Sequence, residues 1–130
     1  NEIVIDGVAF AKQPAKPQDL DGLWRITGRK VGDNMNSIAR GDRKTIKVLV
    51  RGYFQWIAIN PAEKGFYGTG GGKYSFANGK YQENILFFSR DNSRVGASLN
   101  FEGKLENQQW HHSGTSSKGD PIYEIWSRDN

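Results

Sequence analysis

Two glutamates, Glu83 and Glu124, are the side chains with the clearest chemical potential, because both lie in short segments rich in aromatic residues. Paired carboxylates in one cavity can do acid–base chemistry, since the pKa of one rises while that of the other stays low. The same groups can instead orient a polar ligand group or join an internal hydrogen-bond network. We favour binding without catalysis, assign no catalytic residue, and keep an acid–base enzyme using Glu83 and Glu124 as the less favoured alternative.

Other catalytic and metal-binding patterns are missing from the sequence. It has no cysteine, and its only histidines, His111 and His112, are adjacent. Neighbouring residues of a strand point to opposite faces, so the pair cannot chelate one metal. Residues 68–73 resemble a phosphate-binding loop, but Tyr74 follows the lysine and no helix follows the glycines. We therefore predict no metal and no cofactor.

Short β-strands must position the two glutamates, because apolar residues recur every second position. The strands are predicted at residues 23–30, 44–50, 53–60, 66–77, 80–89, 95–102, 104–112 and 121–128. Their connections are short, and Asn78-Gly79 is typical of a type I′ hairpin. No crossover helix separates them, so the sheet should be antiparallel. Closure would remove its edges. The predicted fold is an all-β, eight-stranded antiparallel up-and-down β-barrel.

The chain is long enough for one domain, at residues 19–130, preceded by an N-terminal extension or tether at residues 1–18. No apolar run is long enough for a transmembrane helix. Charge is uneven, because residues 25–51 hold eight basic and two acidic side chains. This segment could attract an anion. The excess is too small to predict nucleic-acid binding.

Two motifs, one in the first and one in the last predicted strand, resemble those of a known family. Gly22-Leu23-Trp24 matches the Gly-x-Trp signature of lipocalins and the wider calycin group, and Arg128 stands where that group places an arginine across the tryptophan. Residues 53–56, 70–74, 80–85 and 124–128 resemble small bacterial secreted lipocalin-like proteins of unknown function. The resemblance implies that Gly22, Trp24 and Arg128 close one barrel end through cation–π stacking. It also implies a secreted, periplasmic or surface-tethered protein.

Strand alternation selects the residues that should line the barrel. We place Glu83 inward with Tyr81, Ile85 and Phe87, and Trp56 inward with Phe54 and Ala58. The predicted ligand-binding residues are Trp56, Tyr74, Glu83, Phe87, His111, Glu124 and Trp126. Partners for Glu83 and Glu124 could be Tyr74, Gln109, His111, Arg128 or each other. The long loop of residues 31–43 is expected to overhang the open mouth. Arg29, Arg40 and Arg43 would favour an anionic head group there.

The favoured function is therefore non-enzymatic binding of a small hydrophobic or amphipathic molecule inside the barrel. Eight-stranded barrels can hold one small ligand, but they can also be filled by side chains. The alternative is a filled barrel that acts as a protein or polymer interaction module, with Trp110 on its outer wall. The sequence alone leaves the ligand's identity and the oligomeric state open.

Overall fold

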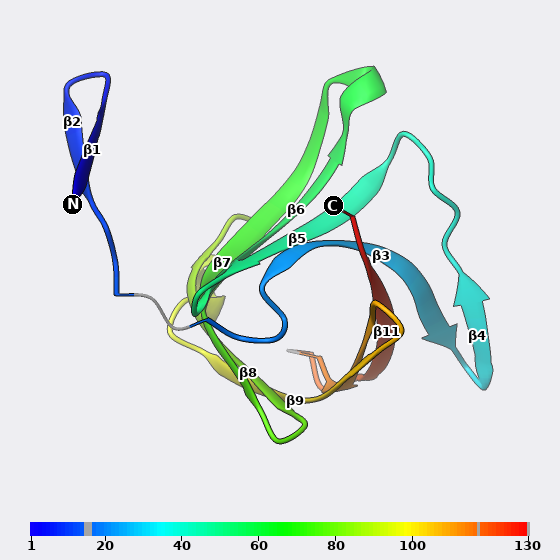
Figure 1. Ribbon diagram of the computed structural model, residues 1–130. Helices are drawn as coiled ribbons and strands as arrows, with labels where there is room; N and C mark the ends of the chain where they lie inside the picture. The colour runs from blue at the N-terminus through cyan, green and yellow to red at the C-terminus, as the bar shows by residue number, and fades with distance from the viewer. Residues whose placement is uncertain (15–16, 117, 130) are drawn as a thin grey trace.

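Eight antiparallel strands close into a barrel in the computed structural model, which describes residues 1–14, 17–116 and 118–129 (Figure 1). Each strand pairs with the next along the chain, and the last pairs with the first. The barrel strands are β3 (Gly22–Val31), β5 (Lys44–Val50), β6 (Tyr53–Asn60), β7 (Gly65–Ala77), β8 (Lys80–Phe88), β9 (Ser98–Glu106), β10 (Gln109–Thr115) and β11 (Pro121–Arg128). The predicted fold class is confirmed.

Three further strands lie outside the ring of eight. β1 (Glu2–Ile5) and β2 (Val8–Ala11) form a separate hairpin within the predicted extension, and β4 (Asn34–Ser37) pairs with the end of β3. Short 3₁₀ helices occupy Pro61–Glu63 and Asn92–Arg94. None of the described residues forms a helix long and apolar enough to cross a bilayer.

The expectation that residues 31–43 form a loop over the mouth was largely wrong. β3 continues to Val31 and turns back as β4, and this ribbon projects beyond the barrel wall (Figure 1). All four residues of β4 are exposed. Only Ile38 turns inward, where its N–H donates to the Thr27 carbonyl and its side chain packs against the core. The segment therefore borders the mouth without covering it.

The predicted turn near Gly103 was also misplaced. β9 runs through Gly103, and the turn falls at Asn107 and Gln108, whose φ angles are 52° and 62°. Packing explains the glycine at position 103, because a Cβ there would stand 2.8 Å from the Phe76 ring. By contrast, the Asn78-Gly79 turn is confirmed, since both residues have the positive φ that a type I′ turn requires.

An aromatic cluster fills the barrel toward the end that carries Trp24. Trp110 packs edge-on against both Trp24 and Tyr81, with ring centroids 5.8 and 4.9 Å apart. All three side chains have no solvent exposure. The expectation that Trp110 lies on the outer wall was therefore wrong, because alternation along β10 turns it inward with His112.

Candidate functional site

The end of the barrel that carries Trp24 is sealed by side chains. The guanidinium of Arg128 lies 4.3 Å from the centroid of the Trp24 ring and donates to the carbonyls of Asp19 and Asp21 at 3.0 and 2.9 Å. The Trp24 indole N–H donates to the Leu20 carbonyl at 2.8 Å. These bonds hold residues 19–21 across the barrel end, which we call the closed end.

A charged pair occupies the interior just beyond this seal. The Lys47 ammonium lies 2.9 Å from Glu83 Oε2, which also accepts a 2.6 Å hydrogen bond from the Tyr81 hydroxyl. The side chains of Lys47 and Glu83 are only 7% and 9% exposed. Burial and the Glu83 carboxylate raise the pKa of Tyr81, so its hydroxyl stays a donor.

Aromatic rings surround the buried ammonium of Lys47. Its Nζ lies 5.2–5.6 Å from the ring centroids of four residues, which are Phe54, Tyr81, Trp110 and Trp126. Such faces are attractive to a cation that has left water. The carboxylate of Glu83 and these four rings pack around Lys47, so side chains fill this half of the barrel. The pairing of Glu83 with Lys47 was not predicted from the sequence, where the expected partners were Tyr74, Gln109, His111, Arg128 or Glu124.

Two predicted site residues therefore lie in the filled half. Glu83 points inward as predicted, but its carboxylate is bound by Lys47 and Tyr81. A substrate therefore cannot reach it, which argues against Glu83 as an acid or base in catalysis. Tyr74 is buried at the closed end, where its hydroxyl donates to Asp21. Burial and that carboxylate raise the pKa of Tyr74 well above its ordinary value.

Two other predicted site residues point away from the barrel interior. Phe87 is 42% exposed on the outer wall, over Gly71, because a bulge in the β7–β8 pairing shifts the alternation after Ile85. His111 faces outward and its Nδ1 lies 2.8 Å from the Tyr123 hydroxyl. Its neighbour His112 is the inward histidine, and it is buried. The expectation that Phe87 and His111 line the barrel interior was wrong.

Of the remaining three predicted residues, Trp126 belongs to the aromatic cluster around Lys47 and is 4% exposed, whereas Trp56 and Glu124 lie in the open half of the barrel. Trp126 donates its indole N–H to Glu124 Oε1 at 3.2 Å, and Glu124 Oε2 lies 4.0 Å from Arg29 Nη2. Trp56 packs edge-on against Phe88 at 5.6 Å between centroids. Glu124 keeps 20% exposure, although it points inward. The open half therefore presents the partly exposed ring of Trp56 and the carboxylate of Glu124 to the interior.

A pocket of about 230 Å³ opens in the wall where β3 and β5 diverge, which we call the lateral pocket. Pairing between these strands stops at Arg25 and Ile46. The pocket is lined by Arg25, Ile26, Arg29, Ile38, Ala39, Arg43, Lys44 and Thr45. It combines four cationic side chains with an apolar floor and has no acid in its lining.

The cations of the lateral pocket are held by neutral or distant partners. Arg25 Nη2 donates to the Gly41 carbonyl at 2.8 Å, and Arg43 stacks on the Tyr67 ring at 4.4 Å. Within the described part of the chain, the 4.0 Å contact of Arg29 with Glu124 is the only ion pair that these four cations make. Their charge therefore remains largely uncompensated, which favours an anion in the pocket.

A second hollow, of about 450 Å³, lies at the mouth between the end of β8 and the loop after β10. Its lining includes Phe88, Arg90, Arg94 and Lys118, with Asp91 as its acid. The Arg94 guanidinium lies 5.6 Å from the Phe88 ring and 3.3 Å from Asp91. Positive side chains thus border the mouth on this side as well.

His112 makes the fold sensitive to acid. Its Nδ1 has no hydrogen-bond partner among the described residues, and burial, followed by the nearby Lys47 charge, holds the pKa of His112 well below 6.5. Below pH 6.5 the His112 imidazole therefore binds a proton in the unfolded chain but not in the folded chain. We expect the free energy of unfolding to fall from pH 6.5 toward pH 5 by up to about 1.4 kcal/mol per pH unit.

Urea denaturation over this pH range measures the effect. His112→Leu should flatten the pH dependence, whereas His111→Leu, one residue away on the outer face, should keep it. An unchanged slope in His112→Leu would contradict this assignment.

Comparisons with known proteins agree with the observed fold. No family model and no curated protein matches the sequence. Among solved structures, a lipocalin-like protein from Bacteroides uniformis matches with a TM-score of 0.58 and 14% identity, over 86% of this chain and 100% of its own. An uncharacterized protein from Bacteroides eggerthii matches with a TM-score of 0.55 and 13% identity, over 84% and 99%. The protein therefore has a lipocalin-like barrel fold.

Proposed function

We propose that this protein binds a small amphipathic molecule with an anionic head group in the lateral pocket, without catalysing a reaction. The observation that carries the proposal is the lining of that pocket, where four cations surround an apolar floor and no acid is present. Ile26 and Ile38, which supply this floor, belong to the core or pack against it. An apolar group can therefore be buried beside a bound anion.

The depth and size of the site limit the ligand. The Lys47–Glu83 pair and its aromatic neighbours occupy the closed half, so a ligand has only the open half. The lateral pocket, at about 230 Å³, is smaller than the roughly 300 Å³ at which drug-sized sites begin. A compact carboxylate, sulfonate or phosphate ester fits these limits better than a retinoid-sized molecule.

Three inward residues predicted from the sequence, Glu124, Trp126 and Trp56, support the same site indirectly. Glu124 lies beside Arg29 and can restrain its guanidinium at the edge of the pocket. Trp126 holds Glu124 through its indole N–H, and Trp56 extends the aromatic surface toward Phe88. In this proposal Arg29 and Arg43 contact the head group, and Glu124 positions Arg29.

Two fluorescent probes of similar shape test the proposal. The anionic 1-anilinonaphthalene-8-sulfonate should bind saturably at one site, and the uncharged N-phenyl-1-naphthylamine should bind more weakly. A charge-assisted hydrogen bond contributes about 1.5–3 kcal/mol, so we expect Arg29→Gln with Arg43→Gln to weaken the anionic probe roughly tenfold or more. Added salt should weaken it in the same direction.

The control removes the same charge elsewhere. Lys80→Gln with Lys104→Gln changes two exposed lysines that are absent from the lateral pocket lining, and should leave probe affinity unchanged. A site specific for anions would be ruled out if the two probes bound with equal affinity. It would also be ruled out if the two double variants lost equal affinity for the anionic probe.

A further inference from the structure

The β1–β2 hairpin carries one continuous apolar face. Ile3 pairs with Phe10 and Ile5 pairs with Val8, so these four side chains share a side of the ribbon. Their exposures range from 51% to 63%. The opposite side carries Glu2, Val4, Ala9 and Ala11. The four-residue set is called the hairpin face below.

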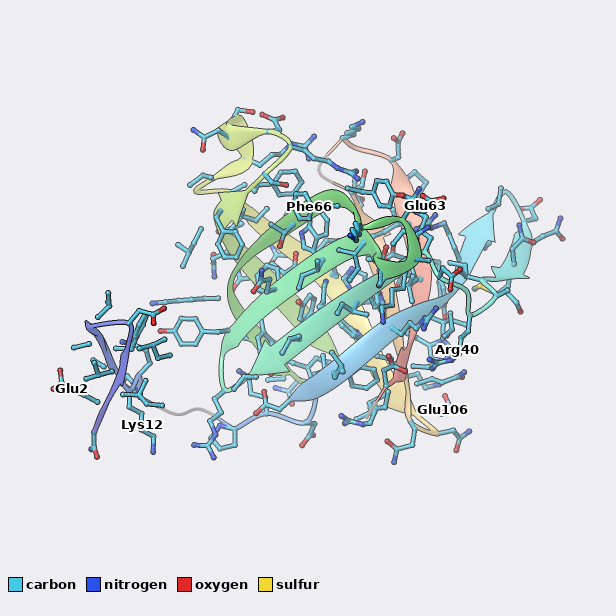
Figure 2. All side chains as sticks on the ribbon, turned by 90° about the horizontal axis from the view of Figure 1, so that it is seen from above. Glu2, Lys12, Arg40, Glu63, Phe66 and Glu106 are labelled. Atoms are coloured by element: carbon cyan, nitrogen blue, oxygen red, sulfur yellow. The ribbon has the colours of Figure 1, made fainter. Side chains whose placement is uncertain are left out.

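The hairpin face has no cover from the barrel of its own chain. Figures 1 and 2 show the hairpin to one side of the barrel, with Glu2 and Lys12 labelled on it in Figure 2. An isolated two-stranded ribbon is marginally stable in water, and a large exposed apolar patch marks an interaction site. The hairpin face therefore requires a partner surface.

The outer wall of the barrel offers such a surface. Because Lys47 and Leu49 point inward, Val48 and Val50 alternate outward, and they line a groove of about 310 Å³. Tyr53 and Phe54 of β6, with the bulge residues Leu86 and Phe87 of β8, complete its apolar lining. Val50, Leu86 and Phe87 are each 42–54% exposed. We call this surface the outer groove.

Charge also matches between the two surfaces. Residues 1–12 contain two acids, Glu2 and Asp6, and one basic side chain, Lys12, which follows the end of β2. The four strands β5 to β8 contain a single acid, Glu83, and it points inward. At the groove, Lys73 places its ammonium 6.0 Å from the Tyr53 ring. An apolar hairpin with a small excess of acid thus meets an apolar wall with a positive border.

The course of the chain selects a second copy as the source of the hairpin. Gln18 is anchored at the closed end, where it donates to the Tyr74 carbonyl at 3.4 Å and accepts from the Phe76 N–H at 2.6 Å. Gln13 Oε1 then accepts a 3.5 Å bond from the Tyr53 hydroxyl, at the border of the outer groove. β2 ends only two residues before Gln13, at Ala11, and the hairpin leads away from its own barrel (Figure 1).

From this arrangement we infer that two copies of the chain form a twofold dimer by exchanging hairpins, each hairpin face covering the outer groove of the other copy. Exchange of an identical element is a low-cost route to a closed dimer. Both hairpins contribute, so eight large apolar side chains are covered in one assembly. The open end and its lateral pocket take no part, so the dimer stands apart from the proposed ligand binding.

The mass of the full chain in solution tests the dimer. Sedimentation velocity should give a dimer that dissociates with dilution over about a hundredfold range of concentration. Ile3→Ser with Phe10→Ser, on the hairpin face, should shift the protein to monomer. So should Leu86→Ser in the groove, where the side chain is already 54% exposed. Val4→Ser, on the opposite side of the same strand, should leave the dimer intact.

Cross-linking identifies which chain supplies the hairpin. The protein has no cysteine, so Val8→Cys and Leu86→Cys can be placed in separate, differently tagged chains. A short bis-maleimide should link the two tags if hairpins are exchanged. The proposal is overturned if the wild type is monomeric throughout, if the hairpin-face variant stays dimeric, or if a chain with both cysteines links only within itself. This last result would place the hairpin on its own barrel.

Discussion

Replacing Lys47 with methionine should destabilise the protein by about 3–5 kcal/mol, because it leaves a buried carboxylate without its counter-ion. Glu83 would keep only the Tyr81 hydroxyl among the partners it has in the structure. Solvent cannot replace the ammonium, since the Glu83 side chain is 9% exposed. Urea denaturation followed by tryptophan emission measures the loss, since Trp110 and Trp126 surround the pair.

Two further variants separate a paired charge from a lost side chain. Lys47→Met combined with Glu83→Gln removes both charges but keeps an acceptor for Tyr81, so most of the lost stability should return. Lys80→Met breaks the Lys80–Glu102 pair, whose side chains are 71% and 62% exposed, and should cost less than about 1 kcal/mol. A double variant as unstable as Lys47→Met would show that packing, and not charge, dominates at this position.

The same pair explains why the sequence predicted the barrel better than its contents. Residues 44–50 were correctly predicted as a strand, yet Lys47 was counted with the basic segment of residues 25–51. Its inward direction depends on Glu83, which is 36 residues away and reaches it only after three intervening strand pairings. Local alternation contains no information on that contact.

A one-residue shift in register accounts for one of the two misplaced site residues. Strand predictions at 44–50, 53–60 and 121–128 match the observed bounds, and Trp56 and Glu124 face the interior side as expected. Phe87 was misplaced because a bulge within β8 changes the alternation by one. The bulge is not visible in the apolar pattern, since both faces of β8 carry apolar residues. His111 was selected without an assigned inward face for residues 104–112, and its neighbour His112 is the inward one.

The filled interior limits the size of the ligand that this barrel can bind. A deep carrier cavity would need the space that Lys47, Glu83 and three tryptophans occupy. The uncompensated cations instead lie at the wall opening between β3 and β5. Side chains alternate along β5, so the burial of Lys47 inside the barrel places Val48 and Val50 on the outer wall. The alternation of this one strand therefore helps to fill the barrel and also supplies the outer groove.

Gly72→Ala should be as damaging as loss of the buried ion pair, because a Cβ at this position has no room. It would stand 1.9 Å from the carbonyl oxygen of Asn84 and 2.9 Å from the backbone nitrogen of Leu86. Both atoms belong to the backbone of β8, so no side-chain rotation relieves the contact. The two strands must separate at the bulge, and we expect a loss of about 3 kcal/mol or more, measured by urea denaturation.

Gly41→Ala is the matched control, because nothing lies within 4 Å of the Cβ it would add. It should change stability by less than about 0.5 kcal/mol, or stabilise slightly by restricting the unfolded chain. A loss below about 1 kcal/mol in Gly72→Ala would contradict the close approach of β7 and β8. That approach accompanies the bulge after Ile85, which turns Phe87 to the outer groove and leaves Phe88 beside Trp56. A stable Gly72→Ala variant would therefore undermine the assignment of both aromatic residues to their faces.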